Sequence, residues 1–415
     1  MPERLTAPED GPAREVYASR AVEAYAAMQK RFRTRSGLYR RDGLLHRPGT
    51  SAHLWPFARA MFAALDLAGT PGGLGGLAGL GGLGGLGTPG GLGDAGFDAE
   101  AAIAADLDAL ERYWDMRGPV PAYSSDVVSG RLGRGVGPMA GGDRYYDDNA
   151  WVGLALVQLE RLRPGMGRLD RAAEMFGFAV SGWDTNPDAP SAGGVFWVEQ
   201  VRGLGLRNHD RNTVSTAPNA QLGLHLAELG AGDPAGGEWS VSPEEMVAWV
   251  NRALDASRDT PAPGTGLFFD KLRGDGTLDD TLWSYNQGSM IGANVLLARG
   301  AESEQRARFL ARAEAIARGA LTHYAGVGYE RQGPAFNAIF FRNLLLLHAA
   351  SGDEALRAAI IAAMRAYADD AWAGRRNRRN LFRFSRSGVT LLDQSSITQI
   401  LALLAWDPEA YWKLA

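Results

Sequence analysis

The most constraining feature of this sequence is the alternation of two kinds of helical segment. Apolar residues recur at helical spacing in about twelve segments, whereas strand-like alternation is scarce and short. Taken in order along the chain, the segments form pairs. The first segment of each pair is amphipathic, as at residues 311–318, and its charged face is typical of an outer helix. The second is apolar nearly all round, as at residues 291–298, which is typical of a buried helix. We therefore predict an all-α fold with inner and outer helices.

We interpret the segments as six helical hairpins, an internal repeat of roughly 55–70 residues. Long links separate many of the helices, and within each pair these links contain Gly, Trp, Asn and Tyr. The predicted pairs are 12–33 with 52–67, 98–116 with 146–163, 168–183 with 212–229, 243–257 with 282–298, 303–324 with 334–350, and 354–373 with 391–405.

The second helix of every pair opens with polar and aromatic residues, as at 53–55 (HLW) and 393–396 (DQSS), and the first helices do not. An (α/α)6 double barrel places six parallel inner helices inside six antiparallel outer ones. All the polar openings then meet at one end, in a single cleft. A helical solenoid is the competing architecture, but it does not predict polar groups gathered at one end of alternate helices. The pattern therefore favours the double barrel.

The composition is that of a globular protein and excludes several function classes. With 415 residues and 46% hydrophobic content, the chain can bury a full core, and we predict one catalytic domain over residues 1–415. The formal net charge of −4 provides no global basic field for nucleic acid. The sequence has no cysteine, which excludes disulfides and thiolate metal sites.

Two segments bear on domain organisation and location. Residues 69–96 are rich in glycine with leucine at every third position, and we interpret them as a flexible surface insertion. The N-terminal residues are polar and acidic, without the apolar core of a secretory signal, and no apolar run reaches membrane-spanning length. We therefore expect a cytoplasmic monomer, or a secreted protein if a leader has been removed.

Asp147 and Asp148 are adjacent at the start of an apolar helical run, and they are the candidate catalytic pair. Two neighbouring carboxyls titrate in a coupled way, so that one proton is harder to remove than the other. An acid and a nucleophile in glycoside cleavage need that asymmetry. The structural alternative is an ordinary helix start, where acidic residues are common.

Aromatic and amide side chains accompany the pair at the predicted cleft. Rings stack on the apolar faces of sugars, and amides bind their hydroxyls, although the same residues also serve as packing groups and helix caps. The uncharged character of the cleft favours a neutral carbohydrate. The candidate substrate-binding residues are Tyr146, Trp151, Trp197, Asn212, Trp283, Tyr285, Asn286, Gln287, Phe336 and Arg342.

The adjacency of the two aspartates also favours one mechanism. Consecutive helical residues point about 100° apart, so their carboxyls lie only a few ångströms from each other. A separation of about 5–5.5 Å is typical of retaining glycosidases, whereas inverting enzymes need about 6.5–9.5 Å to accommodate a water. We therefore favour double displacement through a covalent glycosyl-enzyme.

Four motifs together resemble glycoside hydrolase family 76: residues 146–151 (YDDNAW), 212–215 (NTVS), 285–288 (YNQG) with 291–293 (IGA), and 335–342 (AFNAIFFR). The resemblance covers about residues 54–406. It implies an (α/α)6 fold and endo-α-1,6-mannanase-like, retaining cleavage of α-mannan or manno-oligosaccharides, without metal or cofactor. It also implies that Asp147 is the nucleophile and Asp148 the acid/base. Asn337 is a departure, because many members carry Lys there.

Three other function classes remain as alternatives. A sugar epimerase of the N-acylglucosamine 2-epimerase type needs paired histidines at the inner helix mouths, and only His53 lies near one. A terpene-type synthase needs a further acid after Asp147 and Asp148. The third is a non-catalytic carbohydrate-binding protein with the same fold. No histidine spacing indicates a metal site.

Two charged motifs remain outside this interpretation. The pair at 279–280 is expected to cap the helix that follows it. The basic stretch 375–379 (RRNRR) has two interpretations: it forms a solvated loop, or it contacts phosphate on a glycolipid.

Overall fold

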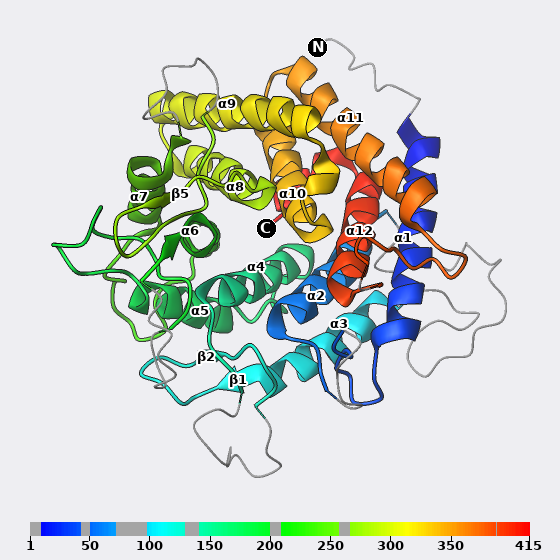
Figure 1. The fold of residues 1–415 in the computed structure, drawn as a ribbon, viewed down its shortest axis with the longest axis horizontal. Coiled ribbons are helices and arrows are strands. Elements are labelled where there is room, and N and C mark those ends of the chain that lie inside the picture. Colours follow the sequence, from blue (N-terminus) through cyan, green and yellow to red (C-terminus); the bar gives the residue numbers. More distant parts are fainter. Residues whose placement is uncertain are drawn as a thin grey trace.

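The computed structural model describes residues 10–42, 50–71, 98–128, 141–199, 209–256, 266–386 and 388–415. The predicted glycine-rich insertion falls largely on residues 72–97, which lie outside the described residues. Within these ranges the chain forms twelve α-helices (Figure 1): α1 (Asp10–Phe32), α2 (Leu54–Ala68), α3 (Ala99–Leu110), α4 (Tyr146–Leu162), α5 (Leu169–Ser181), α6 (Thr213–Glu228), α7 (Pro243–Leu254), α8 (Ser284–Gly300), α9 (Ser303–Val327), α10 (Pro334–Ala350), α11 (Glu354–Asp370) and α12 (Leu391–Ala405).

The even-numbered helices form a closed inner ring. Each packs against the next in order, and α12 packs against α2 to complete the circle. The inner helices are buried on nearly all sides; in α8 every residue from Ser284 to Ala298 is buried. The odd-numbered helices lie outside them, as Figure 1 shows for α9 and α11. The fold is therefore the predicted all-α (α/α)6 double barrel.

The hairpin partners differ from those predicted by one helix. Helices α8 and α9 are joined by two residues, 301–302, and α9 makes most of its inner contacts with α8 rather than with α10. Likewise α5 packs mainly on α4, and α1 packs mainly on α12. Short links make neighbours of the elements that they join, so each tight hairpin runs from an inner helix to the following outer one. The long outer-to-inner connections therefore gather at the N-termini of the inner helices.

Two small antiparallel sheets lie in these long connections. Strands β1 (Trp114–Asp115) and β2 (Ala122–Tyr123) pair in the connection before α4. Strands β3 (Arg211–Asn212), β4 (Lys271–Leu272) and β5 (Leu278–Asp279) form a three-stranded sheet in that order. Because β3 directly precedes α6 and β4–β5 precede α8, this sheet joins two connections that are distant in sequence.

The fourth residue of five inner helices holds the connection that leads into the helix. Asn149 Oδ1 accepts a hydrogen bond from the backbone N–H of Tyr123 at 2.8 Å. Four other residues bond the backbone in the same way. Gln287 accepts from Phe268 (2.8 Å), Gln394 from Phe382 (3.0 Å) and Thr216 from Val195 (3.1 Å), while Asn337 donates to the carbonyl of Tyr329 (2.9 Å). These side chains satisfy buried backbone groups of irregular segments and fix the connections against the ring.

A buried ion pair ties three inner helices together. Arg342 of α10 donates to both carboxylate oxygens of Asp66 in α2, each at 2.5 Å, and to Gln158 Oε1 of α4 at 3.1 Å. Arg342 also donates to the backbone carbonyl of Ala415 at 3.4 Å. Because Asp66 is fully buried, loss of its partner would leave an unpaired charge away from water.

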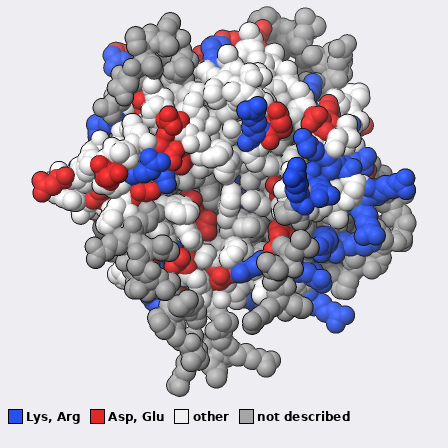
Figure 2. All heavy atoms as spheres, in the orientation of Figure 1, with Lys and Arg blue, Asp and Glu red and all other residues white. Residues whose placement is uncertain are grey.

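Charges are unevenly distributed over the surface. On the face shown in Figure 2, Lys and Arg gather on one side, over α1 and the connection between α11 and α12. Among the described residues, no helix is both long enough and apolar enough to cross a membrane.

We predict that Arg342→Met lowers the free energy of unfolding by about 3–5 kcal/mol, because removing one partner of a buried pair leaves the other charge uncompensated. Urea denaturation followed by circular dichroism measures the change. Arg308→Met is the matched control, since Arg308 is exposed and pairs only with the exposed Glu304; it should cost at most about 1 kcal/mol. Equal stabilities for the two variants would contradict a structural role for Arg342.

Candidate active site

A pocket of about 550 Å³ lies at the N-termini of the inner helices. Its volume is in the usual range for small-molecule sites. Residues from the starts of α2, α4, α6, α8 and α10 and from the connections between them line it: His53, Trp55, Pro56, Ser125, Tyr145, Asp147, Asp148, Trp151, Trp197, Asn212, Val214, Asp270, Lys271, Tyr285, Phe336 and Ile339. The predicted convergence of polar and aromatic openings is therefore observed for five of the six inner helices, whereas the opening of α12 at residues 393–396 does not line the pocket.

The two aspartates occupy the first turn of α4 but have different surroundings. Asp147 accepts two hydrogen bonds, one on each oxygen. The backbone N–H of Asp148 donates to Oδ1 at 3.0 Å, and the indole N–H of Trp197 donates to Oδ2 at 3.2 Å. No described residue donates a hydrogen bond to the Asp148 carboxyl. Donors to a carboxylate stabilise its charged form, so the structure favours ionisation of Asp147.

The pKa values of the pair follow from these surroundings. Burial raises the pKa of Asp147 to about 7, although its two hydrogen bonds oppose the rise. Burial, followed by the nearby charge of Asp147, raises the pKa of Asp148 well above its usual range. Once the pH rises above about 7, the coupled pair therefore holds a single proton, and the position that favours it is Asp148.

Asp270 is a third carboxylate in the pocket that sequence reasoning missed. Asn286 Nδ2 donates to its Oδ1 at 3.2 Å, and the hydroxyl of Tyr285 donates to the same oxygen at 3.4 Å. Burial raises the pKa of Asp270, and its charge in turn raises the pKa of Asp147. Asp270 directly precedes β4, and its backbone carbonyl accepts from the N–H of Thr213 at 2.9 Å. Sheet pairing therefore carries a loop acid into the site, which no helical pattern could reveal.

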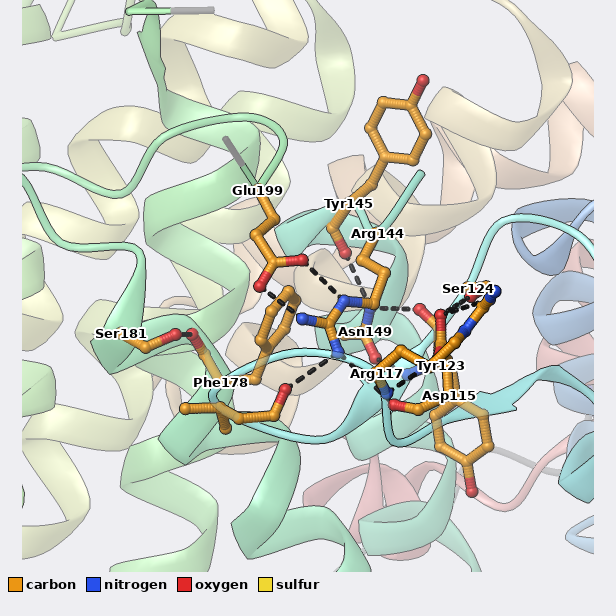
Figure 3. Close-up of polar contacts among 11 residues, drawn as sticks. Asp115, Arg117, Tyr123, Ser124, Arg144, Tyr145, Asn149, Phe178, Ser181 and Glu199 are labelled. Carbon is orange, nitrogen blue, oxygen red and sulfur yellow. Dashed lines mark hydrogen bonds and ion pairs between the residues drawn. The ribbon is translucent and has the colours of Figure 1, made fainter. Parts of the chain in front are cut away.

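A buried network behind the pocket supports the start of α4 (Figure 3). Arg144 is 1% exposed and binds both oxygens of Glu199, with Nε to Oε2 at 2.6 Å. Its Nη1 donates to the carbonyls of Val120 at 2.9 Å and Asp115 at 3.3 Å. The guanidinium also lies over the ring of Phe178. One cation thus connects the β1–β2 connection, the segment leading into α4 and the segment that carries Glu199.

This network sets the position of Trp197 relative to Asp147. The N–H of Tyr146 donates to the carbonyl of Trp197 at 3.1 Å, and the N–H of Glu199 donates to the carbonyl of Arg144 at 2.9 Å. Asn149 Nδ2 donates to the carbonyls of Tyr145 at 2.8 Å and Tyr123 at 3.0 Å (Figure 3). The segment bearing Trp197 is therefore aligned along the residues that precede Asp147.

The structure sorts the sequence-predicted substrate residues into three groups. Those that line the pocket are Trp151, Trp197, Asn212, Tyr285 and Phe336. Those that lie behind its wall are Tyr146, Trp283, Asn286 and Gln287. The third group is Arg342, which is ion-paired to Asp66 and does not line the pocket.

The residues behind the wall have structural partners. Tyr146 stacks on Phe178 with ring centroids 4.4 Å apart, and Trp283 packs edge-on against Phe336 at 5.4 Å. Gln287 donates to the carbonyl of Phe268 at 2.9 Å. Their side chains thus support groups that face the pocket, such as Phe336 and Asp270.

Several pocket residues were absent from the predicted set. Trp55 stacks on Phe336 at 6.1 Å, which extends the aromatic surface. His53 Nδ1 lies 3.2 Å from Asp126 Oδ1 at the edge, and Lys271 pairs with Asp210 at 2.9 Å. His53 and Trp55 open an inner helix, and that signal could have identified them. No group of three or more metal-ligating His, Asp or Glu side chains occurs within the described ranges.

Comparison with known proteins identifies a family. The model of glycosyl hydrolase family 76 matches residues 137–404. No curated protein matches the sequence.

Solved structures share the fold at low sequence identity. A family 76 glycoside hydrolase (mannosidase) from Bacteroides thetaiotaomicron has a TM-score of 0.71 at 18% identity, over 94% of this chain and 98% of that one. A family 76 α-mannanase of the same species has a TM-score of 0.69 at 14% identity, over 94% and 95%. An inactive variant of the α-1,6-mannanase of a Salegentibacter species, with two consecutive aspartates replaced by asparagine, has a TM-score of 0.66 at 16% identity, over 94% and 99%.

We predict that Trp197→Phe raises the pKa of Asp147 above about 7, because the indole N–H that stabilises its carboxylate is lost. A rise of about half a unit to one unit is expected for an exposed hydrogen bond to a charged group. A pH titration of aspartate carboxyl carbons by NMR measures it. Trp412→Phe is the control, since Trp412 is 48% exposed and does not line the pocket. A lower or unchanged pKa in Trp197→Phe would contradict the role of the indole.

We predict that Arg144→Met lowers the free energy of unfolding by about 3–5 kcal/mol, because Glu199 is then buried without its cation. The double variant Arg144→Met/Glu199→Gln should recover much of this loss, since no uncompensated charge remains. Denaturant unfolding of both variants measures the coupling. Additive losses would show that the two side chains act independently.

Proposed function

The chain belongs to glycosyl hydrolase family 76, and on that premise we propose that it is a retaining α-1,6-mannosidase that acts on α-mannan or manno-oligosaccharides. Family membership makes the chain a glycoside hydrolase. The observation that carries the finer proposal is the unlike surroundings of Asp147 and Asp148, at one edge of an aromatic pocket. One carboxyl is stabilised as an anion and its neighbour retains a proton, which is the division of roles that double displacement requires.

The proposed first step breaks the glycosidic bond. The Asp147 carboxylate attacks the anomeric carbon and forms a glycosyl ester, while Asp148 transfers its proton to the departing glycosidic oxygen. In the second step Asp148, now ionised, takes a proton from a water whose oxygen attacks the same carbon, and Asp147 leaves as a carboxylate. Two inversions return the original configuration. The raised pKa of Asp148 suits the acid role near neutral pH.

Sugar recognition is assigned to the residues that line the pocket. Trp197, which is 41% exposed, offers a ring face next to Asp147, and the Trp55–Phe336 stack offers a second aromatic surface. Asn212 and Asp270 supply polar groups for hydroxyls. Asp270 has a further role as a tuning residue, because its charge helps to hold the pKa of Asp147 near 7.

Related structures support the linkage. Inactive variants of the Salegentibacter α-1,6-mannanase, each with two consecutive aspartates replaced, were solved in complex with α-1,6-mannotriose and α-1,6-mannotetraose. Those complexes concern that enzyme, and we extend the linkage to this chain because its own adjacent aspartates line the pocket. The epimerase alternative lacks support, since His53 is the one histidine among the described residues that line the pocket and it faces Asp126.

We predict that the protein cleaves α-1,6-mannotetraose, and that Asp147→Asn and Asp148→Asn each lower kcat/KM by at least about 10²–10⁴-fold. Chromatography over time separates internal cleavage from release of mannose alone, and NMR of the first product gives its anomeric configuration. Asp280→Asn is the control, an exposed acid outside the pocket.

Two results would contradict the proposal. A folded protein that leaves the tetrasaccharide intact would exclude the α-1,6-mannosidase assignment, and an inverted first product would exclude double displacement. The roles of the two aspartates are separated by an aryl α-mannoside with a good leaving group. This substrate needs no acid in the first step, so it should restore glycosylation in Asp148→Asn but not in Asp147→Asn.

A further inference from the structure

A strongly basic hairpin lies between α11 and α12 and takes no part in the mechanism above. No acidic residue occurs between Asp370 and Asp393. The side chains of Arg376 and Arg383 donate to neutral oxygens of the hairpin itself, and no described carboxylate pairs with any of its arginines. Six exposed arginines make up this arginine hairpin: Arg375, Arg376, Arg378, Arg379, Arg383 and Arg386.

The backbone of the arginine hairpin is fixed although its side chains are exposed. Phe382 is fully buried, and its N–H donates to Gln394 Oε1 at 3.0 Å. Gln394 Nε2 donates to the carbonyls of Asn380 at 3.0 Å and Ala24 at 2.9 Å. Across the hairpin, the N–H of Arg383 donates to the carbonyl of Arg375 at 3.0 Å. The cations therefore project from a defined frame.

A chain of contacts joins the arginine hairpin to the edge of the pocket. The N–H of Leu391, at the end of the hairpin, donates to Asp42 Oδ2 at 2.7 Å. The preceding residue, Arg41, is ion-paired to Asp126. Asp126 lies 3.2 Å from His53, which lines the pocket. The basic surface is thus part of the same rim, at the same end of the barrel as the two aspartates.

The adjoining end of α1 adds to this surface with four more exposed cations: Lys30, Arg31, Arg35 and Arg40. In Figure 2 the Lys and Arg atoms gather on this side of the face. The whole chain has a formal net charge of −4, so this gathering of positive charge opposes the overall balance. Nearly all basic residues of the chain are arginines, since only three of the 43 are lysines. The use of arginine in the hairpin is therefore not distinctive, whereas the clustering of positive charge at this place is.

Like charges fixed close together repel each other and destabilise the folded state. An anion bound on this surface would remove that repulsion, and guanidinium groups bind phosphate through paired hydrogen bonds. The pocket itself contains three acidic side chains, and those that are ionised repel anions. An anionic group is therefore best accommodated on the rim while a neutral sugar occupies the pocket.

We propose that the arginine hairpin binds phosphodiester groups carried by the substrate, so that the natural substrate is a mannose glycan with phosphate near the cleaved linkage. This inference rests on the proposed function, since it assumes that the pocket holds mannose. The phosphodiester has two sources, a soluble phosphorylated glycan or a lipid-linked one.

Three substrates test the proposal with the full chain: α-1,6-mannotetraose, the same tetrasaccharide with a methyl phosphodiester on its reducing end, and the tetrasaccharide joined through a phosphodiester to diacylglycerol in phosphatidylcholine vesicles. The variant is Arg378→Glu/Arg379→Glu. The matched control is Arg306→Glu/Arg308→Glu, which makes the same charge change in the first turns of α9, an outer helix whose N-terminus lies at the opposite end of the barrel.

At low salt we expect the wild type and the control to cleave the phosphodiester substrates more efficiently than the neutral one. The hairpin variant should lose about fivefold in kcat/KM on the phosphodiester substrates, as expected for two exposed ion contacts, and keep its rate on the neutral tetrasaccharide. The preference should fade as salt rises from about 20 to about 500 mM, because exposed charges are screened. A preference for both phosphodiester substrates identifies the phosphate itself, whereas a preference for the vesicle substrate alone identifies the lipid-linked source.

Two outcomes would overturn the inference. One is an equal kcat/KM of the wild type on all three substrates at low salt. The other is hairpin-dependent binding to bare vesicles that contain phosphatidylinositol, without preference for either phosphodiester substrate, which would make the surface a membrane contact. Failure of the proposed function is distinguishable, because sedimentation of the protein with substrate vesicles measures hairpin-dependent binding without any turnover.

Discussion

The central constraint on this structure is that two adjacent carboxyl groups must be held in the first turn of a buried helix. The pKa values of Asp147 and Asp148 are both higher in the folded protein than is usual for aspartate, and burial is the main cause. A carboxyl whose pKa rises on folding favours the folded state when protonated, and that contribution is lost as the pH rises through the raised pKa. Near neutral pH the pair therefore works against folding. Other interactions must hold α4 in place, and the closed ring and the Arg144–Glu199 pair are suited to do so.

The barrel resolves this conflict by separating the stabilising interactions from the reactive groups. At the start of α4, residues 147 and 148 face the pocket, while Asn149 points back and holds the backbone of Tyr123. The same arrangement recurs in α8, where Tyr285 faces the pocket and Gln287 holds Phe268. Because consecutive helical residues point in different directions, the first turn of a helix can place one side chain in the pocket and use another to bind the backbone of the preceding connection. The anchoring of these connections thus rests on Asn149 and Gln287 and not on the two aspartates.

The sequence predicted the helical scaffold better than it predicted the role of each pocket residue. Helical periodicity predicted the inner and outer helices, because burial all round an inner helix leaves a clear apolar pattern. The polar openings of the inner helices then favoured the double barrel over a solenoid. The pairing of helices was shifted by one, since segment order says nothing about which link is short. The polar openings correctly predicted the position of the pocket, and Asp147 and Asp148 line it.

The sequence pattern could not show which individual residues at the helix starts face the pocket. An amide that faces the pocket and an amide that binds a loop backbone occur at the same helix starts, so Asn212 and Gln287 carried equal weight in the sequence. Arg342 looked like a pocket cation because it follows Phe336 on the same helix, but it lies nearly two turns further along and meets Asp66 in the core. Asp270 was missed for the opposite reason. It belongs to no helix, and the pairing of β4 with a strand about 60 residues earlier brings it to the pocket.

The arrangement of charge around the pocket is consistent with both proposals. Cations close to Asp148 would stabilise its carboxylate and lower its pKa, which would remove the proton that the leaving oxygen needs. The cation that lines the pocket, Lys271, is paired with Asp210. The arginine hairpin lies on the exposed rim, where its field is screened over about 8–10 Å at physiological ionic strength. A substrate phosphate can therefore be bound outside the pocket while the interior keeps the low polarity that maintains a protonated acid.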